Sequence, residues 1–579
     1  MDSTGWTTFA TRNLAVPLLL LIAAASAVAP VAAAPPNPTR SRAQWPPPMR
    51  TGEVAPAAPP KLLQRDCPEY TSWAVDRSHK PLSKGRNMLP MQRPEPDCRM
   101  FVVEEVEETI NEMRRAIADP DLFRLFENCF PNTLDTAVKW HGLAAQTKDE
   151  ELTFIVTGDI DAMFVTSFYF SDVANYGPVA MKPKSVAGLR LLNNEGSLAS
   201  LFRGAINMQA RFIERSPHCN AFRAPPESGT SSNMPVSSDY VWPTPDREVV
   251  FECKWELDSL AAFLQLSHEY YEGTGDLSFF GKHGWVNAVE AIMNTTTRLQ
   301  AGTYAEDGLP NVSPYRFQRQ TSTASETLSN SGDGNPVVGG TGLVRSAFRP
   351  SDDATIYQLL VPANMMFSRY LASCAEIMAR LASDDTPDDV HSRFRRGLAR
   401  DMSALAKHVR RGIERHAKVR HDVYGEMYAY EIDGSGSHNL MDDANLPSLL
   451  SSAMMGFVSK DDPTYLNTRK FIFSKENPYF MHGPVLNGTG GPHIGPGMAW
   501  PMSLIVRIIT TDDDDEIIAT LRQLVESTDG LGLMHESINT FSATMYTRPW
   551  FSWANGLFGQ MMLDLKNRKP HILQTVYFQ

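Results

Sequence analysis

Long amphipathic segments dominate the sequence from about residue 100 and limit its fold more than any other feature. Apolar side chains recur at helical spacing over Val103–Ala118, Leu359–Leu381 and Val390–Ala417, which places them on one face of a helix. The first segment starts with glutamates and ends with Arg114 and Arg115, the charge order that the helix dipole favours. We therefore expect a large, mostly helical domain with long loops.

Candidate strands are few and short, and Leu152–Val156 and Met427–Ile432 are the clearest. The acidic run Asp512–Glu516 precedes an apolar helical pattern and is expected to start a helix rather than bind a metal. No strand–helix–strand alternation and no GxGxxG after a strand occurs. The glycine-rich stretch Asn487–His493 lacks the lysine that a phosphate cradle needs. These patterns favour a helical domain over a parallel α/β fold.

The composition is that of a globular chain with a large core. Of 579 residues, 42% are hydrophobic and 21% are charged, too little charge for a disordered protein. The formal net charge is −12 and no basic block occurs. We expect no nucleic-acid partner, because binding to a phosphate backbone relies on clustered lysine and arginine.

Residues 1–34 resemble a secretory signal peptide. Arg12 precedes an apolar run from Leu14 to Ala34, and Ala25-Ser26-Ala27 offers a small-residue cleavage site. An uncleaved membrane anchor is the alternative, because a run of this length can barely span a bilayer, but its prolines and many alanines argue against it. Residues 35–66 read as a proline-rich linker, and residues 67–579 as a single domain.

The six cysteines show no CxxC spacing, so the sequence predicts no zinc site. Cys67 and Cys98 flank a proline-rich segment and are candidates for a disulfide, whereas six buried free thiols are the equal alternative. Glycosylation sequons begin at Asn294, Asn311 and Asn487. They support a secretory route only modestly, since such triplets often occur by chance.

Acidic side chains gather beside aromatic ones in several loops, among them Thr157–Asp161, Trp255–Asp258, Arg349–Asp353 and Met534–Ser537. Taken singly, such residues are most often helix N-caps. Together they suit glycoside hydrolysis, in which one carboxylic acid protonates the leaving oxygen and a second carboxylate activates water or attacks carbon. Competing chemistry is not indicated, because His535-Glu536 does not continue as HExxH and no GxSxG elbow occurs.

These loops, in this order, resemble glycoside hydrolase family 125, the exo-acting α-1,6-mannosidases. The resemblance covers about residues 105–565. The matching stretches are TGDIDAM (157–163), LFRGAINMQARFI (201–213), WELDSL (255–260), SAFRPSDDAT (346–355), VPANMM (361–366), GEMYAYEIDGSG (425–436), LMDDANLPSLL (440–450), TRKFIFSKENPYF (468–480), GPH (491–493), GLMHES (532–537) and YTRPWFSWANGLFG (546–559).

The resemblance implies an all-α (α/α)6 toroid, a six-hairpin glycosidase barrel with a few short strands in its loops. It also implies an inverting exo-α-mannosidase that hydrolyses non-reducing terminal α-1,6-linked mannose without a metal or other cofactor. The family's motifs place the general acid on Asp352 and the general base on Glu536. Carboxyl groups of an inverting pair lie ~6.5–9.5 Å apart, which leaves room for a water.

Ten further residues in the matching motifs are candidates to hold mannose hydroxyls. They are Asp159, Arg349, Asp353, Asp442, Asp443, Asn445, His493, His535, Arg548 and Trp553. The alternative for each is a helix cap or a support behind the sugar-binding residues. Trp550 and Trp553 are three apart and share a face if both lie on one helix, so one is a candidate for the core and the other for stacking on sugar.

One segment, Phe164–Ala199, departs from the family, which continues after Met163 with Trp-Leu-Arg-Asp-Ser. The missing arginine would remove charge-assisted hydrogen bonds worth ~1.5–3 kcal/mol each. An erroneous transcript or gene structure is one explanation, and a real divergence is the other. The second gives the alternative function, a catalytically impaired glycan-binding relative of the same fold. A toroid glycosidase that acts on another sugar, such as an α-glucoside, is more distant.

The expected partner is a mannose-containing oligosaccharide or glycan, and a membrane is involved only if the N-terminal segment stays uncleaved. The expected location is extracellular, in the cell wall or in the secretory pathway, with a Golgi-type membrane anchor as the less favoured alternative.

Overall fold

Helices form most of the structure. The computed structural model describes residues 67–164, 198–229, 237–384 and 389–577, and residues 63–579 form one compact unit. Among the described residues, the α-helices are α1 (Tyr70–Ala74), α2 (Glu104–Ala116), α3 (Pro120–Cys129), α6 (Leu198–Arg215), α7 (Leu257–Thr274), α8 (Trp285–Arg298), α9 (Val361–Asp384), α10 (Val390–His416), α11 (Pro463–Ile472), α12 (Pro501–Ile509), α13 (Asp514–Glu526), α14 (Ser552–Arg568) and α15 (Pro570–Leu573).

The strands are short, and every pairing among the described residues is antiparallel, in sheets of two or three strands. They are β1 (Val138–Leu143), β2 (Glu151–Ile155), β3 (Met163–Phe164), β4 (Ala221–Phe222), β5 (Tyr240–Trp242), β6 (Val250–Glu252), β7 (Arg316–Gln318), β8 (Leu359–Leu360), β9 (Lys418–His421), β10 (Gly425–Tyr428), β11 (Glu431–Ile432), β12 (His438–Asn439), β13 (Phe480–Met481), β14 (Gly488–Thr489), β15 (Met498–Ala499), β16 (Ile538–Asn539) and β17 (Ser542–Tyr546).

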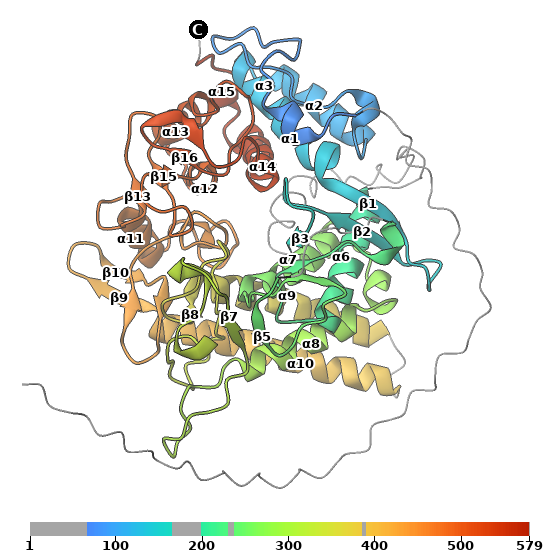
Figure 1. Ribbon diagram of the computed structural model, residues 1–579, viewed down its shortest axis with the longest axis vertical. Helices are drawn as coiled ribbons and strands as arrows, with labels where there is room; N and C mark the ends of the chain where they lie inside the picture. The colour runs from blue at the N-terminus through green and yellow to red at the C-terminus, as the bar shows by residue number, and fades with distance from the viewer. Residues whose placement is uncertain (1–66, 165–197, 230–236, 385–388, 578–579) are drawn as a thin grey trace, which may run out of the picture. The chain divides into compact units, whose positions relative to one another are not determined.

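The helices pack on one another in a closed circuit, which Figure 1 shows around the centre of the view. α3 packs on α14, α14 on α12, and both α12 and α9 on the 3-10 turn η8 (Leu450–Ser452). α9 packs on α7, α7 on α6 and α6 on β2, while β1 contacts the turn Thr133–Ala137 that follows α3. A second set packs outside: α2 on α3, α8 on α6, α10 on α9 and α13 on α12. The fold is therefore the expected (α/α)6 toroid.

The pair α9 and α10 shows how the sequence produces these layers. In α10 the buried apolar residues recur every three or four positions, at Leu398, Met402, Leu405, Val409 and Ile413, so one face packs on α9. α9 also packs on α7 and is buried on most of its faces. The amphipathic helix therefore lies outside, and the more apolar helix lies between neighbours.

The ring is closed by contacts between the two ends of the described chain. The Ala118 N–H donates to the Leu573 carbonyl oxygen at 2.8 Å, and the Tyr577 N–H donates to the Asp119 carboxylate at 2.8 Å. Asn128 in α3 donates to the Gly532 carbonyl oxygen at 2.9 Å. These bonds join α3 to the segments on both sides of α14.

The segment before α2 is fixed to the ring by a buried ion pair. Arg93 Nε donates to Asp135 Oδ2 at 2.7 Å, and the two side chains are 6% and 2% exposed. Burial raises the pKa of Asp135, against the Arg93 charge. The Cys67–Cys98 disulfide closes the same segment.

The predicted helices Val103–Ala118, Leu359–Leu381 and Val390–Ala417 are confirmed as α2, α9 and α10. The acidic run is also confirmed as a helix start, because Asp513 caps α13. The strand predicted at Leu152–Val156 is β2.

The single strand predicted at Met427–Ile432 is wrong. β10 pairs with β9, whereas β11 pairs with β8 and β12 in a different sheet. Ala429 and Tyr430 separate the two strands. Because both residues are buried, the hydropathy pattern does not show that the strand is interrupted there.

The alternative of six free thiols is also wrong. Cys67–Cys98 and Cys219–Cys253 are disulfides, and Cys129 and Cys374 are buried free cysteines. The signal peptide or anchor (1–34), the linker (35–66) and nearly all of the divergent segment after Phe164 lie outside the described residues. In the described part, no helix combines the length and the hydrophobicity that a membrane span requires.

Candidate active site

Residues 349–353 form a tight turn that presents Asp352. The Arg349 N–H donates to the Asp353 carbonyl oxygen at 2.8 Å, and the Asp352 N–H donates to the Arg349 carbonyl oxygen at 2.9 Å. Asp352 has a φ of 67°, in the left-handed region that aspartate tolerates better than most residues. Such a backbone costs free energy and persists where its surroundings hold it, as the hydrogen bonds of this turn do.

A buried ion pair anchors this turn to β11. Arg349 Nε donates to Glu431 Oε1 at 2.6 Å, and neither side chain is more than 3% exposed. Glu431 also accepts from the N–H groups of Ile356 and Tyr357. Burial alone would lower the pKa of Arg349, but the Glu431 charge outweighs it and the pKa is raised. Arg349 thus positions the turn.

Two residues beside a disulfide hold the Asp352 carboxylate. Asn220 Nδ2 donates to Asp352 Oδ1 at 3.0 Å, and Lys254 Nζ lies 3.6 Å from the same oxygen. The Lys254 N–H donates in turn to Asn220 Oδ1 at 3.1 Å. The Cys219–Cys253 disulfide joins the residues directly before them, so it fixes both partners of Asp352 at once.

Lys254 is a buried cation, at 4% exposure. Burial lowers its pKa, but the charges of Asp352 and Glu252 outweigh burial and raise it. Glu256, directly before α7, accepts from Asn220 at 3.2 Å. Burial, and then the Asp352 charge, raise the pKa of Glu256 well above its usual range. The Asp352 carboxylate, which is 29% exposed, therefore faces a buried positive charge.

Glu536 comes from the loop between α13 and β16. Thr547 Oγ1 donates to its Oε2 at 2.7 Å, and Arg548 Nε donates to its Oε1 at 3.0 Å. Burial raises the pKa of Glu536, against the Thr547 hydrogen bond and the charge of His493. Both oxygens are thus oriented by donors from the two residues that directly follow β17.

Asp352 and Glu536 line the same pocket. The other lining residues are Thr157, Ile160, Phe164, Pro350, Ser351, Asn445, His493, Trp500, Arg548, Phe551 and Trp553. Trp500 directly precedes α12, and Trp553 lies in the first turn of α14. The amino-terminal ends of these helices therefore face the site, where their partial positive charge favours oxygen-rich ligands. Flat aromatic faces beside a pair of carboxylates fit a sugar ring.

His493 supplies a second positive charge to this pocket. Its Nδ1 lies 3.6 Å from Asp353 Oδ2. Burial lowers the pKa of His493, but its interaction with Asp353, followed by the charges of Asp352 and Glu536, raises it to about 9. His493 is therefore an imidazolium at neutral pH, and Asp353 is the buried carboxylate that keeps it charged.

Asp442 lies behind the pocket. Its carboxylate accepts from the N–H groups of Leu449 and Leu450 at 2.8 and 3.0 Å. Burial raises its pKa to about 8 against these hydrogen bonds. Asp442 therefore holds the start of the η8 turn.

Asp443 supports two pocket residues. Its carboxylate accepts from Ser351 Oγ and from the Asn445 backbone and side-chain nitrogens, all at 3.0 Å. A Cβ at Gly491 would lie 2.9 Å from the Asp443 carboxylate oxygens, so glycine is needed there for the close approach. Asn445 reaches the pocket, and Asp443 orients it.

His535 and Asp159 lie on either side of Arg548. His535 is completely buried, stacks on Tyr546 with ring centroids 4.0 Å apart, and has Nδ1 3.0 Å from the Arg548 carbonyl oxygen. Burial lowers its pKa. Asp159 is 41% exposed and pairs with the Arg548 guanidinium. Of the ten sugar-binding candidates, Asn445, His493, Arg548 and Trp553 line the pocket.

Trp550 and Trp553 do not lie on one helix, because α14 begins only at Ser552. Trp550 instead packs with Tyr70 and Leu533 in a separate apolar cluster. The ring centroids of Tyr70 and Trp550 are 4.8 Å apart in an edge-to-face arrangement. Trp553 is the tryptophan of this pair that reaches the pocket.

Sequence reasoning missed Asn220, Lys254 and Thr547. Asn220 and Lys254 each directly follow a cysteine. Knowledge of the Cys219–Cys253 disulfide would have predicted that these two residues lie close together. Thr547 sits between two matching motif residues, but a threonine carries no chemistry that marks it as a carboxylate partner.

The chain matches known proteins over most of its length. The family model of the metal-independent α-mannosidases, glycoside hydrolase family 125, matches residues 119–563. The chain belongs to glycoside hydrolase family 125. The motif resemblance is thereby confirmed, and the toroid carries a mannosidase of the glycoside hydrolase class.

Two further comparisons extend over most of the chain. The meiotically up-regulated gene 157 protein of Schizosaccharomyces pombe is 45% identical over 510 residues, which cover 88% of this chain and 94% of that protein. A Streptococcus pneumoniae metal-independent α-mannosidase, solved in a non-productive complex with α-1,6-mannobiose, is 32% identical. Its structure aligns with a TM-score of 0.69 over 81% of this chain and 99% of that chain.

Proposed function

We propose that the protein is an exo-acting α-mannosidase that releases terminal α-1,6-linked mannose with inversion, with Asp352 as general acid and Glu536 as general base. The observation that carries the proposal is that these two carboxylates line one pocket and have partners of different kinds. The α-1,6-mannobiose bound by the bacterial relative supports the linkage. The substrate is accordingly a mannose-containing oligosaccharide or glycan.

Asp352 donates its proton to the glycosidic oxygen as the bond to the departing group breaks. The carboxylate that remains is stabilised by Asn220 at 3.0 Å and by Lys254 at 3.6 Å. Because Lys254 is buried and charged, its attraction strengthens as negative charge develops on Asp352. This is stabilisation of the transition state rather than of the bound substrate.

Glu536 removes a proton from the water that attacks the anomeric carbon from the opposite face. Thr547 and Arg548 each occupy one of its oxygens, which fixes the plane of the carboxylate toward that water. His493 balances the charge of the two carboxylates in the pocket. Trp500, Phe551 and Trp553 offer apolar faces to the sugar ring.

The test is to incubate the purified protein with α-1,6-mannobiose in EDTA and follow released mannose by NMR. We expect β-mannose to appear first, because inversion turns the α-linkage into the β-anomer. EDTA should leave the rate unchanged, as the family description implies. Release of α-mannose first would contradict inversion, and binding without any release would support the impaired glycan-binding alternative instead.

We further propose that residues 1–34 are a cleaved signal peptide, that residues 35–66 are a linker, and that the protein is secreted or resides in the secretory pathway. The two disulfides support this location, because disulfides persist in oxidising compartments. Asn311 is exposed and its sequon is a candidate for glycan attachment. Mass spectrometry of the protein from its native cells tests both points, and an intact N-terminus without a glycan would contradict them.

A further inference from the structure

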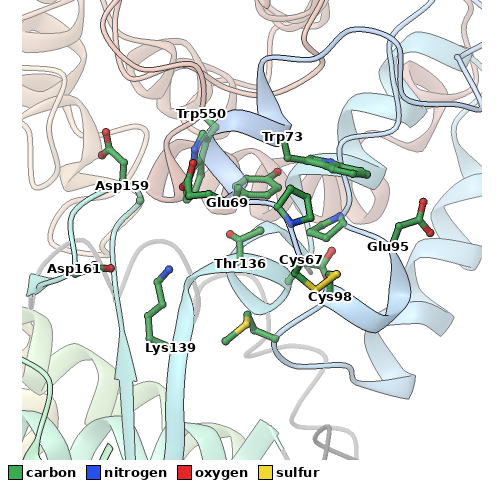
Figure 2. Close-up of a pocket in the computed structure, with 16 residues that line it drawn as sticks. Cys67, Glu69, Trp73, Glu95, Cys98, Thr136, Lys139, Asp159, Asp161 and Trp550 are labelled. Carbon is green, nitrogen blue, oxygen red and sulfur yellow. A yellow bond between two sulfur atoms is a disulfide. The ribbon is translucent and has the colours of Figure 1, made fainter. Parts of the chain in front are cut away.

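A second pocket lies beside the catalytic one and has a lining suited to sugar. Its cavity volume is about 430 Å³, within the range of typical ligand pockets. Figure 2 shows Trp73 and Trp550 along its upper side in that view and Lys139 and Asp161 at the lower left. The lining combines indole rings with carboxylates, a hydroxyl and an amine, the groups that pack against sugar rings and bond their hydroxyls.

Two of its polar side chains are available to a ligand. Lys139 on β1 and Asp161 in the loop before β3 are both exposed, and within the described ranges neither side chain has a hydrogen bond or ion pair to another residue. Trp550 by contrast is only 4% exposed and is held by Tyr70. A rigid aromatic wall thus faces two free polar groups.

The loop 157–161 separates this pocket from the catalytic one. Thr157 and Ile160 line the catalytic pocket, whereas Gly158, Asp159 and Asp161 line the second. Asp159 also pairs with Arg548, which donates to Glu536. One ion pair therefore forms the border between the two pockets.

One wall of the second pocket comes from a segment outside the family match. Cys67, Glu69, Trp73, Glu95 and Cys98 line it, and all precede residue 119, where the match to the family begins. The Cys67–Cys98 disulfide holds this wall. The pocket is therefore built jointly by the toroid and by this N-terminal segment.

We propose that the second pocket binds a mannose unit of the aglycone, the part of the glycan that remains after cleavage. The proposal rests on the proposed function, since it assigns a further subsite to the same substrate. Five carboxylates, Glu69, Glu95, Asp135, Asp159 and Asp161, and one cation, Lys139, line the pocket. This balance favours neutral sugar and disfavours a phosphorylated one.

The test compares a long substrate with a short one. In the double variant Lys139→Ala/Asp161→Asn, we expect KM for a linear α-1,6-mannohexaose to rise about tenfold, the loss of two ordinary hydrogen bonds. The kcat/KM for α-1,6-mannobiose should stay within about twofold, because a disaccharide that occupies the catalytic pocket does not extend across the loop.

The matched control is Lys148→Ala/Asp149→Asn, the same two substitutions in the exposed turn between β1 and β2, away from the pocket. It should leave KM for both substrates unchanged. A KM for mannohexaose that is unchanged in the test variant, or that rises equally for mannobiose, overturns the second subsite.

Calorimetry separates failure of the subsite from failure of the proposed function. In a Glu536→Gln background, Lys139→Ala/Asp161→Asn should weaken mannohexaose binding about tenfold relative to Lys148→Ala/Asp149→Asn. Equal affinities would overturn the subsite whether or not the protein is active. If the wild type releases no mannose from either sugar but the affinities differ as expected, the subsite stands and the proposed hydrolysis fails.

Discussion

Asp352 has a positive φ as well as the proposed role of general acid. A substitution that tests this role must therefore tolerate the same backbone conformation. Asparagine tolerates positive φ much as aspartate does and keeps the shape of the side chain. We expect Asp352→Asn and Glu536→Gln each to lower kcat by about 10²–10⁴-fold, the range for loss of general acid or base catalysis. The melting temperature should stay close to that of the wild type, so circular dichroism and mannose release are measured together.

Asp149→Asn is the matched control for Asp352→Asn, because Asp149 is exposed in the turn between β1 and β2. It should retain full turnover. Near-wild-type kcat in either catalytic variant would show that its carboxylate has been given the wrong role.

His493 predicts a pH dependence of stability with a definite sign. Its pKa in the folded protein is raised to about 9, above the value of about 6.5 in an unfolded chain. Its contribution is therefore fully present below about pH 6.5 and is lost as pH rises through about 9. We expect the free energy of unfolding of wild type to fall more between pH 6.5 and 9 than that of His493→Gln.

Urea unfolding at several pH values measures this difference. Parallel pH curves for the two proteins would show that Asp353 does not hold a proton on His493.

At the residue scale, the family motifs located the two proposed catalytic carboxylates but not the residues that orient them. Asp352 and Glu536 were found because their motifs matched a family, and both line the pocket. Asn220 and Lys254 were not found, because their contact with Asp352 depends on how β4, β6 and a distant turn come together. No local pattern encodes such a contact.

At the element scale, periodicity predicted α2, α9 and α10 because each buries one continuous face or lies between apolar neighbours. Periodicity did not predict that the chain passes from one sheet to another at the buried residues Ala429 and Tyr430. Periodicity also does not show that Trp550 lies before α14, where it packs on Tyr70 of α1.

At the element scale, the Cys219–Cys253 disulfide holds β4 near β6 beside Asp352, the proposed acid. We expect Cys219→Ser/Cys253→Ser to lose about 3–4 kcal/mol of unfolding free energy, as loops of this length predict. It should also lose about tenfold in kcat, because Asn220 and Lys254 are then free to move away from Asp352. Denaturant unfolding and turnover on α-1,6-mannobiose report the two effects.

The comparison variant is Cys67→Ser/Cys98→Ser, which opens a loop of similar length away from Asp352. Its stability loss should be similar, with kcat on mannobiose unchanged. If both variants lost kcat equally, or neither did, the disulfide would have no particular link to the acid.

At the scale of the whole molecule, periodicity gave helices but not their arrangement, and the toroid followed only from the family resemblance. Closure depends on α3 packing against α14 and on bonds such as Asn128 to Gly532, 404 residues apart. A hydropathy pattern reports which face of a helix is buried, and not which partner covers it.

The segment before the family match is integral to this molecule. Deleting residues 67–118 would leave Asp135 buried without Arg93, and removing one partner of a buried ion pair costs about 3–5 kcal/mol. It would also uncover Trp550 and Leu533. We expect the shortened protein to unfold at markedly lower urea concentration than residues 67–579, and the single variant Arg93→Met to reproduce part of the loss. Equal midpoints would show that the segment is dispensable.

Closure of the ring by α14 also sets the order in which the protein becomes competent during synthesis. During translation α3 is synthesised hundreds of residues before α14. The apolar face of α3 that packs on α14 therefore stays exposed until translation is nearly complete. Asp352 likewise emerges long before Glu536, whose loop leads directly into the closing helix. A chain that ends before α14 would therefore leave the ring open and be inactive rather than slow.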